Sequence, residues 1–272
     1  MLLLWLACSK PDQLTLPTAS PAVIYLEGGS FDMGVGDVEV GPYGNHWKEI
    51  SQPQHEVTIS SFWLDQLEVT QAEYAAFLNA IELDAEGTAY AHHHPLQPVF
   101  WEAGMFKAEK EAHPINYVSY YNALSFCGWR GGMLPTEAQW ERAAKGIDRE
   151  NPRAYPWEEG GPSCQKAIYY TNNVHCADTP QAVGTRPLGA TPEGIADLGG
   201  NVSEWVYDIY ARYEPESQTN PLGASSGKYR ILRGGGFHET SDAMRATDRV
   251  VANPLSRAEG IGFRCAYAEE PI

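Results

Sequence analysis

A run of small residues between two acids, from Ala196 to Trp205 (ADLGGNVSEW), is the feature that most limits how this chain can fold. Its two glycines let the backbone turn sharply and bring carbonyl groups inward. Carboxylates together with inward carbonyls are the oxygen ligands that a hard cation such as calcium requires. The run therefore predicts either a cation-binding turn, or a tight turn before a strand with Asp197 and Glu204 in solvent.

Composition narrows the class of protein. With 26 Gly and 19 Pro in 272 residues, the chain favours a loop-rich fold over a helical one. Eight Trp and 43% hydrophobic residues are enough for a packed core. The formal charge of −16 argues against nucleic acid as a partner, because phosphates attract basic surfaces. That charge suits an extracytoplasmic or a cation-binding protein without choosing between them.

The N-terminal residues predict export. Residues 1–8 (MLLLWLAC) resemble the end of a bacterial lipoprotein signal, although the segment is short and has no basic region. Cys8 would then carry the lipid, and residues 9–21, rich in Ser, Thr and Pro, would form a tether. No later apolar run reaches the roughly 20 residues that span a bilayer. We expect an extracytoplasmic protein that meets the membrane only through its lipid.

Four cysteines remain: Cys127, Cys164, Cys176 and Cys265. They allow three pairings, and export favours disulfides over free thiols. A zinc site is the rival interpretation, but the chain has no Cys-x-x-Cys pair. We expect two disulfides, with the pairing still open at this point.

Patterning predicts short elements throughout. Strands are expected within residues 23–34, 55–64 and 228–232, and helices at about 70–81, 119–130 and 136–146. Trp140 and Trp205 are expected in the core. The run His92-His93-His94 lies in a long irregular segment, where adjacent side chains cannot all reach one metal. We interpret that run as a solvated loop rather than a metal site.

Eight motifs in register resemble the formylglycine-generating enzyme family, also called the sulfatase-modifying factor domain. They are Gly28–Gly34 (GGSFDMG), Glu68–Thr70, His113-Pro114, Leu134–Glu141 (LPTEAQWE), Tyr155–Trp157, Gly200–Trp205, Arg233–Gly235 and Gly262–Cys265. The resemblance implies a single α+β domain over residues 22–272 with little regular secondary structure, distantly like a C-type lectin. It also implies the pairs Cys127–Cys265 and Cys164–Cys176, and a buttressing role for Arg245 and Arg249 through buried ion pairs.

The family binds calcium, and one of its sites maps onto the opening run. The resemblance implies a side-chain oxygen from Asp197, carbonyls from Gly200 and Val202, and a carboxylate from Glu204. A second family site usually includes an Asn near the position of Ile168 here. The sequence therefore predicts the first site and leaves the second in doubt.

The named activity of the family oxidises a substrate cysteine with two active-site cysteines that hold copper(I). Soft thiolates are what copper(I) selects. Here no cysteine lies between Phe237 and Arg264, and Glu239 stands near the place of the first one. We predict that this protein binds no copper and makes no formylglycine.

Two classes of function remain open. In the first, the domain binds a protein, peptide or glycan at a bacterial envelope, as related variable proteins of diversity-generating retroelements bind their targets. In the second, it is a non-haem iron oxidase like the pyoverdine-maturation branch of the family, with a hard-ligand site from His238, Glu239 and Asp242. We favour the first class, in which those three residues belong to a polar loop without a ligand.

Overall fold

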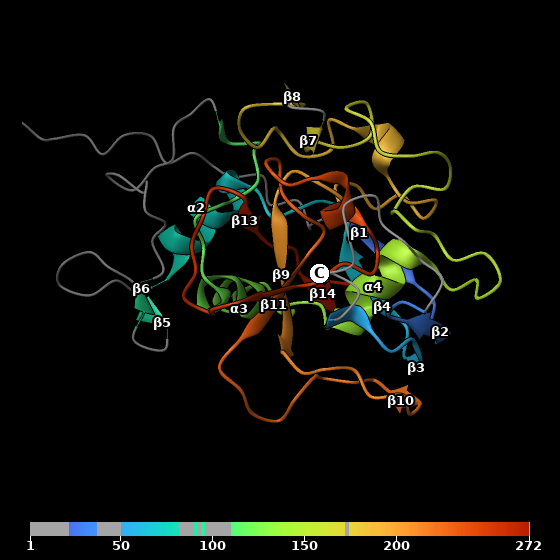
Figure 1. Ribbon diagram of the computed structural model, residues 1–272. Helices are drawn as coiled ribbons and strands as arrows, with labels where there is room; N and C mark the ends of the chain where they lie inside the picture. Colours follow the sequence, from blue (N-terminus) through green and yellow to red (C-terminus); the bar gives the residue numbers. More distant parts are fainter. Residues whose placement is uncertain are drawn as a thin grey trace, which may run out of the picture.

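The computed structural model describes residues 22–36, 50–81, 90–91, 94–95, 110–171 and 174–271, where short elements are joined by long connecting segments (Figure 1). The helices are α2 (Gln71–Ala80), α3 (Tyr120–Trp129) and α4 (Glu137–Lys145), with 3-10 turns η2 (Pro187–Gly189) and η3 (Ser241–Met244). The strands are β1 (Val23–Leu26), β2 (Gly29–Met33), β3 (His55–Ile59), β4 (Phe62–Asp65), β5 (Tyr90–Ala91), β6 (His94–Pro95), β7 (Tyr170–Thr171), β8 (Val174–His175), β9 (Ser203–Ile209), β10 (Gln218–Thr219), β11 (Arg230–Arg233), β12 (Val250–Ala252), β13 (Ile261–Gly262) and β14 (Ala266–Tyr267). This mixture is the α+β fold that the sequence predicted.

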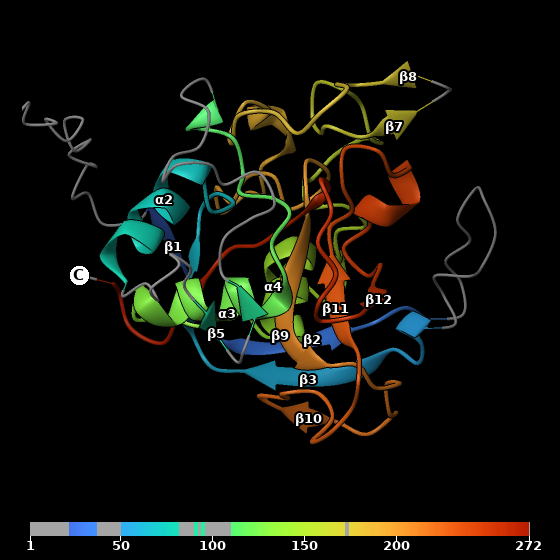
Figure 2. The ribbon, with the colours of Figure 1, turned by 90° about the vertical axis from the view of Figure 1, so that its left-hand side faces the viewer.

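Strand β9 lies at the centre of a four-stranded sheet of order β12-β11-β9-β13. Strand β11 runs antiparallel to β9, and β13 runs parallel to it. Two further sheets have the orders β1-β4-β14 and β10-β3-β2, and Figure 2 shows β2, β3 and β10 crossing below the upright β9 and β11. Because β13 pairs with the start of β9, Gly260 lies beside Ser203, whose N–H donates to the Gly260 carbonyl at 2.7 Å.

Helices α2, α3 and α4 each begin at a capping box, in which the cap side chain and the third helical residue satisfy each other's backbone N–H groups. The pairs are Thr70 with Glu73, Ser119 with Asn122, and Thr136 with Gln139. Helix α4 ends at Gly146, whose φ of 87° lies in the left-handed region. The predicted helix positions are confirmed.

Aromatic side chains fill the core between α2, α3 and the central sheet. Tyr74 of α2 stacks on Phe126 of α3 at 5.6 Å between ring centroids, and Phe126 meets Phe263 edge-on at 5.4 Å. Trp205 belongs to this cluster, and Trp140 of α4 belongs to a second cluster on β2, β3 and β4. Both tryptophans are fully buried, as predicted.

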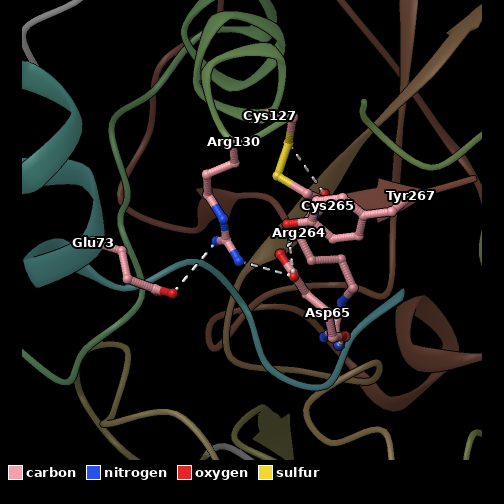
Figure 3. The surroundings of a disulfide bond; sticks show 7 residues. All are labelled: Asp65, Glu73, Cys127, Arg130, Arg264, Cys265 and Tyr267. Atoms are coloured by element: carbon pink, nitrogen blue, oxygen red, sulfur yellow. Dashed lines mark hydrogen bonds and ion pairs between the residues drawn. A yellow bond between two sulfur atoms is a disulfide. The ribbon is translucent and has the colours of Figure 1, made fainter. Parts of the chain in front are cut away.

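The long disulfide joins Cys127 on α3 to Cys265 beside β14, with 5.5 Å between the Cα atoms (Figure 3). Asp65 at the end of β4 reinforces this junction: it accepts the Cys265 N–H at 2.9 Å and pairs with Arg130 at 3.1 Å. Cys164–Cys176 closes a loop of 12-residue separation around β7. Both pairs implied by the resemblance are confirmed.

The chain changes sheet in residues 55–64, where a single strand was expected. These residues form β3, which pairs with β2, and β4, which pairs with β1. Residues 23–34 form the two strands β1 and β2 on either side of Gly28, as their Gly-Gly pair predicts. A Cβ atom on Gly28 would lie 2.6 Å from the Ile59 carbonyl oxygen. The turn between β1 and β2 is therefore in close backbone contact with the turn between β3 and β4. Val57, Ile59 and Phe62 of these two strands are buried.

Several predictions fall on parts of the chain that the structure does not describe. The lipoprotein-like residues 1–8 with Cys8, the tether at 9–21, and His92 and His93 lie outside the described residues. In the described ranges, no helix has the length and apolar character needed to cross a membrane.

Candidate functional site

The glycine-rich run forms a tight turn that feeds directly into β9. Asp197, Gly200 and Asn201 all have positive φ, at 58°, 88° and 64°. The turn is fixed from both sides, because the Gly200 N–H donates to the Gly234 carbonyl and the Asn201 N–H to the Ile168 carbonyl. The run therefore joins the Arg-Gly-Gly segment after β11 to the loop closed by the short disulfide.

Glu204 is fully buried, and its carboxylate is occupied by protein donors. The Arg264 guanidinium donates to both oxygens, at 2.6 to 3.0 Å, and the Trp140 indole N–H donates at 2.9 Å. A calcium ion would have to compete with these donors for the lone pairs of the carboxylate. Glu204 as one of the four calcium ligands therefore stays a prediction.

Two further buried acids surround the same turn. Glu68 accepts from the Asn201 amide at 2.6 Å and the Val202 N–H at 3.1 Å, and Asp197 accepts the Gly184 N–H at 2.6 Å. Burial raises the pKa of Glu68 well above its usual value, and the neighbouring acids raise it further. Burial likewise raises the pKa of Asp197. Calcium at Asp197, Gly200 and Val202 stays a prediction that no contact here supports.

The loop after β11 is the second part of the site. Glu239 bonds back into the protein: its carboxylate accepts the Gly236 N–H at 3.0 Å and the Ser203 hydroxyl at 3.3 Å. Its backbone carbonyl accepts the Tyr170 N–H at 2.8 Å, which ties the loop to the β7–β8 hairpin. Glu239 is thus a structural acceptor that holds the loop against the start of β9.

His238 and Asp242, the other candidates for iron, point to different partners. His238 is exposed, and its ring lies against Phe237 and over Gly260, where an added Cβ would come within 2.5 Å of the ring. Asp242 pairs with Arg245 at 3.5 Å. In the described part of the chain, no group of three or more His, Cys, Asp or Glu side chains converges in a way that could hold a metal.

Buried ion pairs connect α4 to residues on both sides of the loop after β11. Arg233 pairs with Glu141 at 2.5 Å, and Arg249 pairs with Glu137 at 2.6 Å. The buttressing role expected for Arg249 matches this geometry, whereas Arg245 is tied to Asp242 on its own loop. Glu137 and Glu141 of the Leu134–Glu141 motif therefore bind Arg249 and Arg233, which flank the loop after β11.

A cavity of about 240 Å³, which the sequence did not predict, lies beside the start of α2. Polar groups from separate segments line it: Gln71, Lys110, His113, Asn116, Tyr117 and Glu259. Only His113 belonged to a recognised motif, and the others come together through the packing of α2 on residues 110–117. Glu259 directly precedes Gly260, so the cavity adjoins the loop that carries His238.

Comparison with known proteins decides the family. The Sulfatase-modifying factor enzyme 1-like domain matches residues 10–269. The chain belongs to the sulfatase-modifying factor family. It is 29% identical to the formylglycine-generating enzyme of Thermomonospora curvata, over 92% of this chain and 96% of that protein.

Two other relatives in the sulfatase-modifying factor family bear on function. The chain is 30% identical to the mouse protein named inactive C-alpha-formylglycine-generating enzyme 2, over 98% of this chain and 92% of that one. Among solved structures it resembles PvdO from Pseudomonas aeruginosa, with a TM-score of 0.68 and 25% identity, over 91% of this chain and 94% of that one. Membership and fold are thus established, while the family contains proteins of different activity.

Proposed function

We propose that this chain is a recognition domain of the sulfatase-modifying factor family that does not oxidise cysteine. One observation carries the proposal: the loop from Arg233 to Arg245 holds Glu239, locked by Gly236 and Ser203, and no thiol. Every cysteine in the described ranges is in a disulfide. Copper(I) selects thiolates, so this loop offers it no suitable ligand.

The ligand of such a domain would be a protein, peptide or glycan, and the acidic charge of −16 makes nucleic acid an unsuitable partner. The similarity to a mouse protein whose name calls it inactive supports a non-catalytic role, because that similarity extends over nearly the whole of both chains. Fold alone does not decide function, and it is the residues of the loop that support the non-catalytic role.

The alternative is a non-haem iron oxidase, and the likeness to PvdO is what supports it. Its candidate ligands are His238, Glu239 and Asp242. Against it stand the two hydrogen bonds of Glu239 and the pairing of Asp242 with Arg245. A site for iron would require both acids to leave these partners.

Elemental analysis of the purified, disulfide-intact protein separates the two functions. A recognition domain is expected to contain iron and copper far below one atom per chain, also after incubation with Fe(II) or Cu(I) and desalting. Iron at about one atom per chain, lost in Glu239→Gln, would establish the oxidase instead.

Location at the bacterial envelope through a lipid on Cys8 is part of the same proposal. The apolar residues that precede Cys8 and the Ser/Thr/Pro-rich residues after it support this location. We expect the wild-type protein in the membrane fraction of a bacterial host and Cys8→Ala in the soluble fraction. If wild type and Cys8→Ala divide equally between the membrane and soluble fractions, Cys8 does not anchor the protein.

A further inference from the structure

We propose that the 240 Å³ cavity beside α2 binds a neutral ligand rich in hydroxyl groups, namely one sugar ring of a glycan. This inference rests on the proposed recognition function and names its site and ligand class. The cavity lies among the first residue of α2, residues 110–117, Thr179-Pro180 and Glu259. None of these residues takes part in the loop that carries Glu239.

Two amide side chains in the cavity can form further hydrogen bonds. Gln71 is only 7% exposed as a residue, and its side-chain amide forms no hydrogen bond to another described residue. Asn116, also 7% exposed, donates through its amide nitrogen to the Glu259 carbonyl at 2.9 Å, which leaves its Oδ1 to accept another bond. The amide oxygens of these two residues can therefore accept hydrogen bonds from a ligand that enters the cavity.

His113 adds a directed acceptor. Its Nδ1 lies 2.9 Å from the Pro180 carbonyl oxygen, which can only accept, so Nδ1 carries the proton. Burial lowers the pKa of His113, so the ring is neutral near pH 7. In that state its Nε2 is a hydrogen-bond acceptor, like the free oxygens of Gln71 and Asn116.

The charge and size of the cavity limit what can enter. Lys110 and Glu259 both line it, so neither a cation nor an anion is favoured as a whole ligand. The cavity is smaller than the pockets of about 300–1,000 Å³ that hold drug-sized molecules, which suits a single ring. Pro114, Pro180 and Tyr117 supply the apolar surface against which the C–H face of a sugar ring can pack.

Hydroxyl groups match these partners better than peptide groups do. Each hydroxyl both donates and accepts, so neighbouring hydroxyls of one ring can serve Gln71, Asn116 and His113 together. A peptide group offers a single donor and a single acceptor, spaced along an extended chain. Three acceptors around one compact cavity therefore favour a sugar.

The test uses the full, disulfide-bonded protein on an array of neutral glycans, followed by NMR titration with the methyl glycoside of the best terminal sugar. We expect saturable binding that weakens at least tenfold in Gln71→Met. Glu111→Gln serves as the matched control and should bind like the wild type, because Glu111 is exposed and does not line the cavity. Hydrogen exchange of residues 110–117 in the wild-type protein gives a readout that needs no variant, and the sugar should slow it.

Three results would overturn the inference: no binding to any neutral glycan, binding that Gln71→Met leaves unchanged, or Gln71-dependent binding of peptides in place of sugars. Each can occur in a protein that holds no transition metal and oxidises no cysteine. Such a result would remove the sugar site and leave the proposed recognition function standing. Stoichiometric iron or copper would instead contradict the proposed function, whatever the glycan array shows.

Discussion

At the scale of single residues, the contact of Arg264 with Glu204 is the main feature of the glycine-rich turn that the sequence did not predict. The sequence places Glu204 at a family calcium position, yet the fold brings Arg264 onto the same carboxylate from a position 60 residues further along the chain. The sequence around Glu204 or Arg264 does not predict this contact, because the contact depends on the parallel pairing of β13 with β9. A buried guanidinium thus occupies the carboxylate that the pattern assigned to a cation.

Removing that contact should be costly. Glu204→Gln leaves the Arg264 charge buried without its partner, and loss of one member of a buried pair costs about 3–5 kcal/mol. We expect this loss in the free energy of urea unfolding, measured with a calcium chelator present in all samples. Glu193→Gln, which breaks a partly exposed pair with Arg153, should cost less than about 1 kcal/mol. An equal loss in the two variants would contradict the importance of the buried pair.

Buried acids also set the pH dependence of stability. Burial raises the pKa of Asp208 from 3.8 to about 7, and the charge of Glu137 adds to the shift. The folded state therefore binds a proton that the unfolded state releases between about pH 4 and 7, so this group lowers stability as pH rises through that window.

Asp208→Asn should remove this dependence, because an amide oxygen can still accept the Glu137 N–H, which lies 2.7 Å from the carboxylate. Relative to wild type, the variant should gain on the order of 3 kcal/mol in unfolding free energy between pH 4.5 and pH 8. Urea unfolding at several pH values measures the difference. A difference that is constant with pH would show that Asp208 titrates alike in both states.

At the scale of elements, the sequence was informative wherever a local signal existed. The capping residues Thr70 and Thr136 predict their helices, because the cap and its partner lie three residues apart. The division of residues 55–64 into β3 and β4 had no such signal, since both halves keep alternating burial while they join different sheets. The cavity around Gln71 likewise depends on long-range packing, and periodicity cannot reveal it.

The two disulfides should differ in their effect on stability. Cys127–Cys265 spans 138 residues and Cys164–Cys176 spans 12, and a longer loop loses more entropy on closure in the unfolded chain. Replacing the long-range pair by alanines should cost about 4–5 kcal/mol, and replacing the short-range pair about 2–3 kcal/mol. Urea unfolding of the two double variants tests the order, and a larger loss for the short pair would contradict it.

At the scale of the whole molecule, the chain has the family fold, and its segment between Phe237 and Arg264 contains no cysteine. The two disulfides, the buried ion pairs of α4 and the central β9 hold the loop from Arg233 to Arg245 in place. Eight motifs in register allowed the sequence to predict this scaffold, because each is a local feature that the family fold needs. The ligand could not be predicted in the same way, since the residues around the cavity share no motif.

A turnover assay tests directly whether this protein oxidises a substrate cysteine to formylglycine. The disulfide-intact protein, supplied with copper and oxygen, is incubated with a Cys-x-Pro-x-Arg peptide, and the peptide is analysed by mass spectrometry. The Thermomonospora curvata enzyme serves as the positive control. We expect an unmodified cysteine in every sample containing this protein, and formylglycine above the no-enzyme background would show that the protein does oxidise cysteine.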